Sequence, residues 1–174
     1  MKIIKYIVLL VVNFFFINVV NANDIEKITM DIYVDNLGNA HVTEVWVADL
    51  EDGTEGYKPY YNLGNSDIIN FNVELNGKSY TTVSDWDIDW SFNEKAYKAG
   101  LYQVEGGYEL CFGISKYGEN TYTLKYTVTN FVSTTTDSDM IFWELVSYDL
   151  SDKPDYVYIK IYSDFINENN LYIV

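Results

Sequence analysis

Strict alternation of apolar and polar side chains is clearest across residues 121–129. The even positions of this segment are apolar: Tyr122, Leu124, Tyr126 and Val128. Its odd positions carry threonine or lysine. Successive side chains of a strand leave opposite faces of a sheet, so this period of two predicts a half-buried strand. We therefore expect the four apolar residues to face a hydrophobic core.

Shorter runs along the chain show a similar pattern. These runs are Ile28–Val34, His41–Ala48, Ile68–Leu75, Lys78–Val83, Leu101–Val104, Tyr108–Ser115 and Val157–Ile161. In His41–Ala48 apolar residues occupy both odd and even positions and do not define a single apolar face. We expect a β-bulge near Glu44 to account for this change of face. The run Met140–Val146 is apolar on both parities except at Glu144, which is typical of a strand covered on both faces.

Turn residues separate neighbouring runs and predict three hairpins. Asn76 and Gly77 lie between two runs, and this pair favours a type I′ turn because both central residues need positive φ. The clusters 35–39 and 105–107 are also rich in residues that tolerate turns. Each hairpin is therefore expected to place consecutive strands side by side and antiparallel.

Two further segments complete the local prediction. Residues 91–98 favour one or two helical turns capped by Ser91 or Asn93. The turn 116–120 is expected to pair the strand at 121–129 with the strand at 108–115. By contrast, Asp49–Ser66 is the longest irregular stretch, and loops of this length often carry function.

About nine or ten short strands at intervals near 8–12 residues predict an all-β fold, an antiparallel β-sandwich of immunoglobulin-like type. A closed barrel would give the same spacing and stays open as the alternative. The length suits one domain with a hydrophobic core.

The first 22 residues have the layout of a secretory signal peptide. Lys2 and Lys5 precede the apolar run Ile7–Val20, and the small residue Ala22 ends a cleavage pattern. An uncleaved membrane anchor is the alternative, but the run is shorter than the ~20 apolar residues of a membrane span. We therefore predict a signal peptide over residues 1–22 and an extracellular domain over residues 23–174.

The chain is strongly acidic, with a net charge of −15 and no arginine. Removal of the first 22 residues would make it more acidic still, because they carry two lysines and no acid. Nucleic acids and anionic lipids need cationic contacts, so we expect neither as a partner. The excess of acids favours solubility.

Few residues could support catalysis, and we expect a non-enzymatic protein with no cofactor and no metal. The sole histidine, His41, and the sole cysteine, Cys111, fall on different predicted strands. Glu144 interrupts the most apolar run, and a buried carboxylate can mark a functional site. A small hydrolase that uses Glu144 with an aspartate is therefore a third hypothesis. We favour the alternative, in which Glu144 lies at an edge or binds a tyrosine or lysine across the sheet.

The acidic triplet Asp85, Asp87 and Asp89 has the spacing that opens a calcium-binding loop. The rest of that pattern is missing, because Trp90 stands where glycine is required and Ala96 where glutamate is required. We expect the three carboxylates to share the solvated face of a strand.

Aromatic residues make up 17% of the chain and offer candidate ligand-binding positions. These candidates are Trp86, Trp90, Tyr57, Tyr60 and Tyr61, together with Glu144. Aromatic rings on an exposed β-sandwich face can stack on sugar rings, which supports a carbohydrate- or cell-wall-binding module. Packing of the same rings in the core is the alternative, so burial of Trp86 and Trp90 would weaken the sugar hypothesis.

Several motifs, taken in order, resemble the extracellular N-terminal domain of bacterial predicted membrane proteins, the domain of unknown function 2207. After the signal peptide they are Ile32–Glu44, Asn70–Tyr80, Phe112–Val128 and Asp139–Ser147. The resemblance covers most of the chain that follows residue 22. It implies an exported β-sandwich followed by membrane-spanning helices, with no established activity and no catalytic residue to carry over.

The predicted function is therefore that of a non-enzymatic exported domain of the cell envelope. We expect it to be the ectodomain of a membrane-anchored surface protein, with a cell-wall glycan or an envelope protein as its partner. The sequence shows no apolar helix after the strands, so a fragment of a longer membrane protein and a secreted stand-alone domain remain open.

Overall fold

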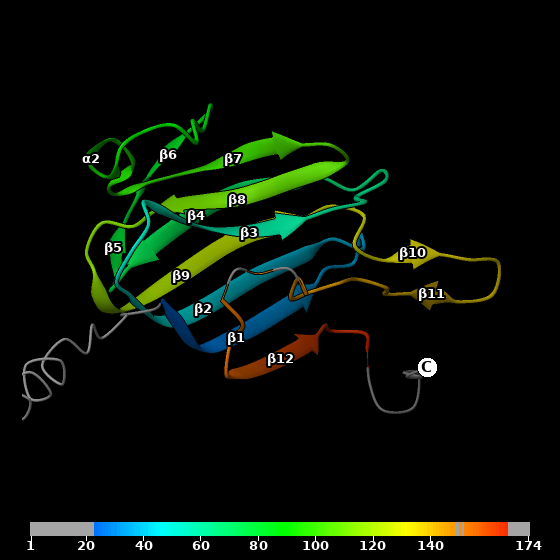
Figure 1. The fold of residues 1–174 in the computed structure, drawn as a ribbon. Coiled ribbons are helices and arrows are strands. Elements are labelled where there is room, and N and C mark those ends of the chain that lie inside the picture. The colour runs from blue at the N-terminus through cyan, green and yellow to red at the C-terminus, as the bar shows by residue number, and fades with distance from the viewer. Residues whose placement is uncertain (1–22, 149, 151, 167–174) are drawn as a thin grey trace, which may run out of the picture.

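The computed structural model describes residues 23–148, 150 and 152–166, which fold into two sheets stacked face to face (Figure 1). The larger sheet has the order β12 (Tyr156–Tyr162), β1 (Asp24–Val34), β2 (Ala40–Leu50), β9 (Gly118–Val128), β4 (Ile68–Leu75) and β5 (Lys78–Ser79). The smaller sheet has the order β3 (Glu55–Tyr60), β8 (Gly107–Gly113), β7 (Lys98–Val104) and β6 (Thr81–Val83). The predicted all-β sandwich is confirmed, and a single closed sheet is not formed.

Most strand pairs among the described residues are antiparallel, as predicted. Two pairs at the sheet edges are parallel: β12 on β1, and β6 on β7. A separate short hairpin, β10 (Ser133–Thr134) with β11 (Asp139–Met140), extends beyond the end of the sandwich (Figure 1).

The core lies between the two sheets and contains the apolar residues predicted from the alternation at 121–129. Tyr122, Leu124, Tyr126 and Val128 are all buried. Phe112 of β8 bridges the sheets, because its ring meets Trp46 edge-on at 5.9 Å and Tyr122 at 4.9 Å between centroids. Contacts of this kind explain why the apolar parity of each long strand points inward.

The three predicted hairpin turns are confirmed. The return strand expected over Lys78–Val83 was wrong in its extent, because only β5 pairs with β4 and β6 crosses to the smaller sheet beside β7. Asn76 and Gly77 have φ of 50° and 80°, as a type I′ turn between β4 and β5 requires. Gly38 and Gly106 also have positive φ in the turns that join β1 to β2 and β7 to β8. Local turn chemistry therefore determines these connections.

The predicted helix at 91–98 is shorter than expected. It forms α2 (Phe92–Lys95), and the backbone N–H and hydroxyl of Ser91 both donate to the Glu94 carboxylate. These bonds lower the pKa of Glu94. No helix among the described residues is both long and apolar enough to cross a membrane.

The expected partner of the strand at 121–129 was wrong. The chain after β8 crosses to the other sheet, so β9 pairs with β2 and β4, and β8 pairs with β3 and β7. The β2–β9 ladder runs without a shift from Ala40 opposite Val128 to Leu50 opposite Gly118. A short turn therefore connects the two sheets here and does not form a hairpin.

The predicted strand at 140–146 was also wrong. Only Asp139 and Met140 are in β11, and Phe142 is 88% exposed. Trp143 holds the segment to the sandwich, since its indole N–H donates to the Phe131 carbonyl and its ring stacks on that of Phe131. Some apolar residues of this segment therefore pack against the sandwich from outside the sheets, whereas Met140 and Phe142 are exposed.

The stretch 49–66 is not wholly irregular, because it contains β3. This strand was hidden in the sequence, since its consecutive buried residues are Lys58, Pro59 and Tyr60 and show no alternation. The bulge expected near Glu44 is absent as well. Met30 lies opposite Glu44 in an unbroken β1–β2 register, and the one shift in that pair falls between Ile25 and Lys27.

Candidate functional site

The outer face of the larger sheet carries a shallow groove of about 340 Å³ near the ends of β1, β2 and β9. The strand register places the outward-facing side chains around this groove in two rows that cross the strands. The first row is Tyr162, Tyr33, His41, Thr127 and Ile69. The second row is Lys160, Asp31, Thr43, Lys125 and Asn72. All of these except Lys160 and Ile69 line the groove.

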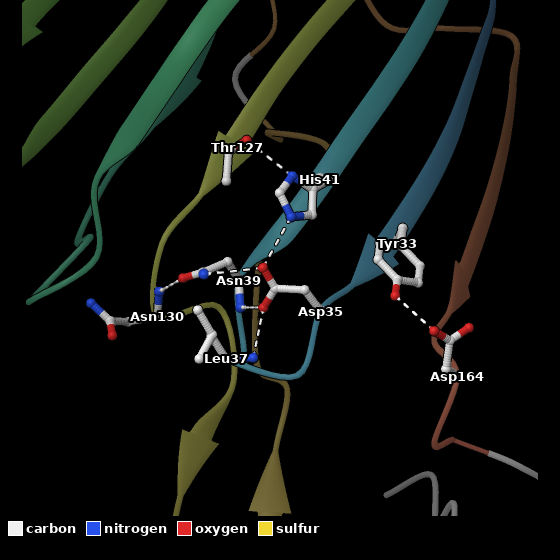
Figure 2. A network of polar contacts seen from close by, with 8 residues as sticks. All are labelled: Tyr33, Asp35, Leu37, Asn39, His41, Thr127, Asn130 and Asp164. Carbon is white, nitrogen blue, oxygen red and sulfur yellow. Dashed lines mark hydrogen bonds and ion pairs between the residues drawn. The ribbon is translucent and has the colours of Figure 1, made fainter.

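The turn between β1 and β2 contacts the groove through His41, and Figure 2 shows the polar contacts of this turn. Asp35 Oδ1 accepts the backbone N–H groups of Leu37 at 2.9 Å and Asn39 at 3.0 Å. Its Oδ2 accepts from the Asn39 amide and from His41 Nε2, which lies 3.0 Å away. Asn39 Oδ1 in turn accepts the backbone N–H of Asn130.

The electrostatics of this turn centre on Asp35. Partial burial alone would raise the pKa of Asp35, but the hydrogen bonds from Asn39, His41 and Leu37 outweigh it and lower the pKa to about 2. Bonds to the ionised form favour that form. The Asp35 carboxylate is therefore already charged at pH 4, and at that pH and above it orients the His41 ring.

Three rings of the first row lie next to one another. The rings of Tyr33 and His41 are stacked at 6.1 Å with 25° between their planes, and Tyr33 and Tyr162 lie 5.6 Å apart. The Tyr33 hydroxyl donates to Asp164, and Thr127 Oγ1 lies 3.3 Å from His41 Nδ1. Tyr33 and His41 are thus fixed by polar partners at their edges (Figure 2).

A distortion of β4 borders the other end of the groove. The β4–β9 register shifts between Ile69 and Asn72, and Asn70 has a positive φ of 59°. The shift leaves the consecutive residues Ile69 and Asn70 both exposed, and the Asn72 amide donates to the Asn70 carbonyl. Bulges re-aim side chains and are common beside binding sites.

A second polar cluster lies inside the sandwich, and the sequence did not reveal it. Glu44 and Lys58 are fully or almost fully buried and form an ion pair of 2.6 Å between β2 and β3. The other oxygen of Glu44 accepts the indole N–H of Trp46 at 2.7 Å. Tyr126 also donates to Glu44 at 2.9 Å, and the hydroxyl of Tyr60 lies 2.8 Å from that of Tyr126.

We call these five residues the core cluster: Glu44, Lys58, Tyr60, Trp46 and Tyr126. Burial and the charge of Glu44 determine the protonation states of its lysine and tyrosines. Burial alone would lower the pKa of Lys58, but the charge of Glu44 raises it overall. Burial raises the pKa of Tyr60 and that of Tyr126. The lysine is therefore charged and both tyrosines are neutral over the physiological range, so the cluster ties the two sheets together.

The tryptophans proposed for sugar stacking do not form an exposed platform. Trp86 is only 5% exposed, and its indole N–H donates to Glu55 at 2.6 Å. Trp90 is half-buried, lies 5.9 Å from Trp86 and has Lys98 Nζ 4.7 Å from one of its rings. Burial removes most of the support that this pair gave to the sugar hypothesis.

The three candidate tyrosines have different environments. Tyr60 belongs to the core cluster and is buried. Tyr57 is half-buried on β3, and Tyr61 follows that strand and is 40% exposed. The structure therefore does not bring these three rings together on one open surface.

The hydrolase hypothesis required a buried carboxylate at position 144, but the buried carboxylate is Glu44. Glu144 is exposed and accepts the backbone N–H of Tyr148 at 3.1 Å. The premise of a buried catalytic Glu144 is therefore wrong. Cys111 is buried on β8, in the sheet opposite His41, and burial raises the pKa of its thiol.

The acidic triplet lies in a loop and not on a strand face as expected. Asp85, Asp87 and Asp89 are all exposed, and Asp87 accepts the backbone N–H of Asp89. Within the described ranges, no three histidine, cysteine or carboxylate residues gather in a way that could hold a metal ion.

Sequence reasoning missed both polar sites for different reasons. Glu44 shares one face of its strand with Val42 and Trp46, and this position was a signal for a buried charge. A β-bulge near Glu44 explained the same pattern equally well. Lys58 gave no signal within a stretch that looked irregular. The groove becomes visible only once the register places Tyr33, His41 and Tyr162 in one row.

Comparisons with known proteins identify the family of the chain. Residues 24–164 match the model described as the N-terminal domain of a predicted membrane protein, DUF2207. No curated protein matches. Among solved structures, the chain is similar to native leukotriene A4 hydrolase from Saccharomyces cerevisiae, with a TM-score of 0.40 and 11% identity. That similarity covers 66% of this chain and 15% of the hydrolase.

The family match spans the sandwich from β1 to the residues just after β12. It therefore includes the outer groove, the core cluster and the four motifs that carried the resemblance in the sequence. The chain belongs to the DUF2207 family of predicted membrane protein N-terminal domains.

Proposed function

We propose that this domain is exported and acts in the cell envelope as the ectodomain of a membrane-anchored protein. The observation that carries the proposal is the match of residues 24–164 to the N-terminal domain of a predicted membrane protein. That match begins directly after residues with the layout of a signal peptide, in which Lys2 and Lys5 precede an apolar run. A net charge of −15 also suits a soluble domain outside the membrane.

We propose further that the domain works by binding and not by catalysis. Glu44, the most deeply buried carboxylate, receives hydrogen bonds from Lys58, Trp46 and Tyr126 and is closed to solvent. The Cys111 thiol is buried, and its raised pKa disfavours the reactive thiolate. Both groups thus support a structural role over a chemical one.

Export can be tested with residues 1–60 fused to a reporter enzyme that is active only outside the cytoplasm. The unchanged fusion should be active, and the variant with Lys2→Glu and Lys5→Glu should lose most of this activity. The control Lys27→Glu makes the same kind of substitution after the predicted cleavage point, and it should not change the reporter activity. N-terminal sequencing of the exported chain should start at Asn23.

Two results would contradict the export proposal. One is a reporter that stays inactive in the unchanged fusion. The other is equal loss of activity in the signal variant and in the Lys27→Glu control. A chain that is exported but keeps its first 22 residues would favour the uncleaved anchor instead.

A carbohydrate- or cell-wall-binding module is the second candidate function. The specific observation that favours it is the groove on the outer face of the larger sheet, with Tyr33, His41 and Tyr162 along one row. The tryptophan pair Trp86 and Trp90, on which this candidate first rested, does not contribute.

A further inference from the structure

We infer that the groove on the outer face of the larger sheet is a binding site for a neutral oligosaccharide that lies across the strands. The site consists of the two rows described above, from β12 through β1, β2 and β9 to β4. It deepens the second candidate function and rests on the proposed export only for where the protein meets its ligand.

The dimensions of the site suit an extended chain and not a single small molecule. Neighbouring strands lie about 4.8 Å apart, so a row that crosses five strands extends over about 19 Å. Each row places one side chain per strand, in an unbroken register between β12, β1, β2 and β9. A ligand that runs along the rows therefore meets a new side chain at regular steps.

The first row supplies flat apolar surfaces with polar edges. Tyr162 is 42% exposed and lies beside Tyr33, which stacks on His41. Lys160 Nζ lies 4.6 Å from the centre of the Tyr162 ring and adds positive charge there. Aromatic rings present an apolar body and a wet edge, which matches a sugar ring with C–H groups on its face and hydroxyls around it.

The second row supplies hydrogen-bonding groups of both kinds. Asp31 can only accept, Lys125 can only donate, and Thr43 and Asn72 can do both. Lys125 is already paired with Glu74 at 3.0 Å, at a site where both side chains are partly exposed. Hydroxyl groups that both donate and accept are the natural partners of such a mixed row.

The charge balance favours a neutral ligand. Four carboxylates lie in or beside the groove, and they outnumber its two lysines, Lys125 and Lys160, so the groove presents no excess of positive charge to an anion; they are Asp31, Asp35, Glu74 and Asp164. The chain as a whole carries a net charge of −15, which repels anionic chains at long range. A neutral oligosaccharide avoids that repulsion and still uses every hydrogen-bonding group of the second row.

The site is held in shape before any ligand arrives. His41 is fixed by Asp35 on one nitrogen and by Thr127 beside the other, and Tyr33 is fixed by Asp164. These contacts join the groove to the turn in Figure 2. Side chains that are already ordered lose little conformational entropy on binding.

On the central strands β1, β2 and β9, the rest of the same sheet face lacks aromatic side chains at the next row. Farther along, the corresponding positions carry Thr29 on β1, Val45 on β2 and Thr123 on β9, which lie opposite one another. These residues offer neither aromatic rings nor charged groups. On these three strands the aromatic residues are therefore concentrated at the hollowed end, whereas β12 continues along the face with the exposed Tyr158 and Tyr156.

The test is a titration of the purified, isotope-labelled chain with cellotetraose, chitotetraose and mannotetraose, followed by NMR. At least one of the three should shift the amide signals of Asp31, Tyr33, His41 and Asn72. Tyr33→Ala should weaken binding about tenfold, the size typical of an aromatic anchor. Tyr156→Ala is the matched control, since it removes an exposed tyrosine from the same sheet face outside the groove.

Asn72→Ala gives a second and milder variant in case Tyr33→Ala disturbs the fold. Asn72 is exposed, so its removal should weaken binding several-fold and leave the NMR spectrum of the free protein largely unchanged. The inference is overturned if no tetrasaccharide shifts the groove signals, or if Asn72→Ala and Tyr156→Ala bind equally well. Shifts caused only by extended peptides would also overturn it. Because this test uses purified protein, its failure is separate from a failure of export.

Discussion

At the residue scale, Asp35 has the most strongly defined electrostatic environment near the groove. Four hydrogen bonds converge on one carboxylate at a turn that must also orient His41. Asparagine and aspartate are common in turns because their side chains bond to nearby backbone N–H groups. Here the same bonds extend from the turn to the binding surface, so Asp35 is both a structural and a positioning residue.

The first prediction concerns the pH dependence that Asp35 confers. Its pKa of about 2 lies below the ordinary 3.8, so its contribution to folding is present above about pH 4 and disappears as the pH falls toward 2. Asp35→Asn should lower the free energy of unfolding by about 1–2 kcal/mol at pH 7, with the difference shrinking between pH 4 and 2. Urea unfolding at a series of pH values measures this.

The control for that prediction is Glu26→Gln, which removes an exposed carboxylate from β1, the strand that precedes the Asp35 turn. Its effect on unfolding should stay within about 0.5 kcal/mol at every pH. A difference between wild type and Asp35→Asn that does not change between pH 4 and 2 would contradict the assignment.

At the element scale, the core cluster explains how β3 is placed over the larger sheet. Lys58 and Tyr60 of β3 reach across the core to Glu44 of β2 and Tyr126 of β9. Apolar packing alone tolerates many registers, whereas a buried charge must meet its partner. We expect this pair to specify the alignment of the two sheets.

The second prediction is a double-mutant cycle on this pair. Lys58→Met and Glu44→Gln should each lower the free energy of unfolding by about 3–5 kcal/mol, because each leaves one buried group without its partner. The double variant should be less destabilised than the sum by about 2 kcal/mol or more. Lys125→Met, which breaks the partly exposed pair with Glu74, should cost no more than about 1 kcal/mol. Strict additivity in urea unfolding would contradict a coupled pair.

The elements also show what could be predicted from the sequence. Alternation and turn residues identified β1, β2, β4, β7, β8, β9 and β12, because these signals are local. The partner of β9 could not be predicted, since residues 114–117 cross between sheets with the same short length as a hairpin turn. The apolar run at 140–146 misled the prediction because its side chains are anchors, such as Trp143 on Phe131.

The candidate site was less predictable than the fold. The tryptophans were candidates because of their residue type, yet Trp86 is buried and its indole N–H donates to Glu55. The groove instead depends on Tyr33 and His41, which the β1–β2 hairpin pairs, and on Tyr162, which joins them through the parallel pairing of β12 with β1. Long-range register of this kind is not encoded in any single stretch of sequence.

At the scale of the whole molecule, the chain is an acidic β-sandwich of the DUF2207 family with its polar groove on one face and a charged cluster in its core. The free edge of β12 and the segment before it expose several apolar side chains, among them Met140, Phe142 and Tyr148. We propose that this molecule faces the outside of the cell.

Thiol labelling of intact cells that produce the full-length chain measures directly on which side of the membrane the domain lies. Glu105→Cys places a thiol in the exposed turn between β7 and β8, whereas the native Cys111 is buried and gives the background in wild type. A membrane-impermeant maleimide should label Glu105→Cys in intact cells as fully as after lysis, and should label wild type weakly in both. Labelling of Glu105→Cys that appears only after lysis would place the domain inside the cell and contradict the account.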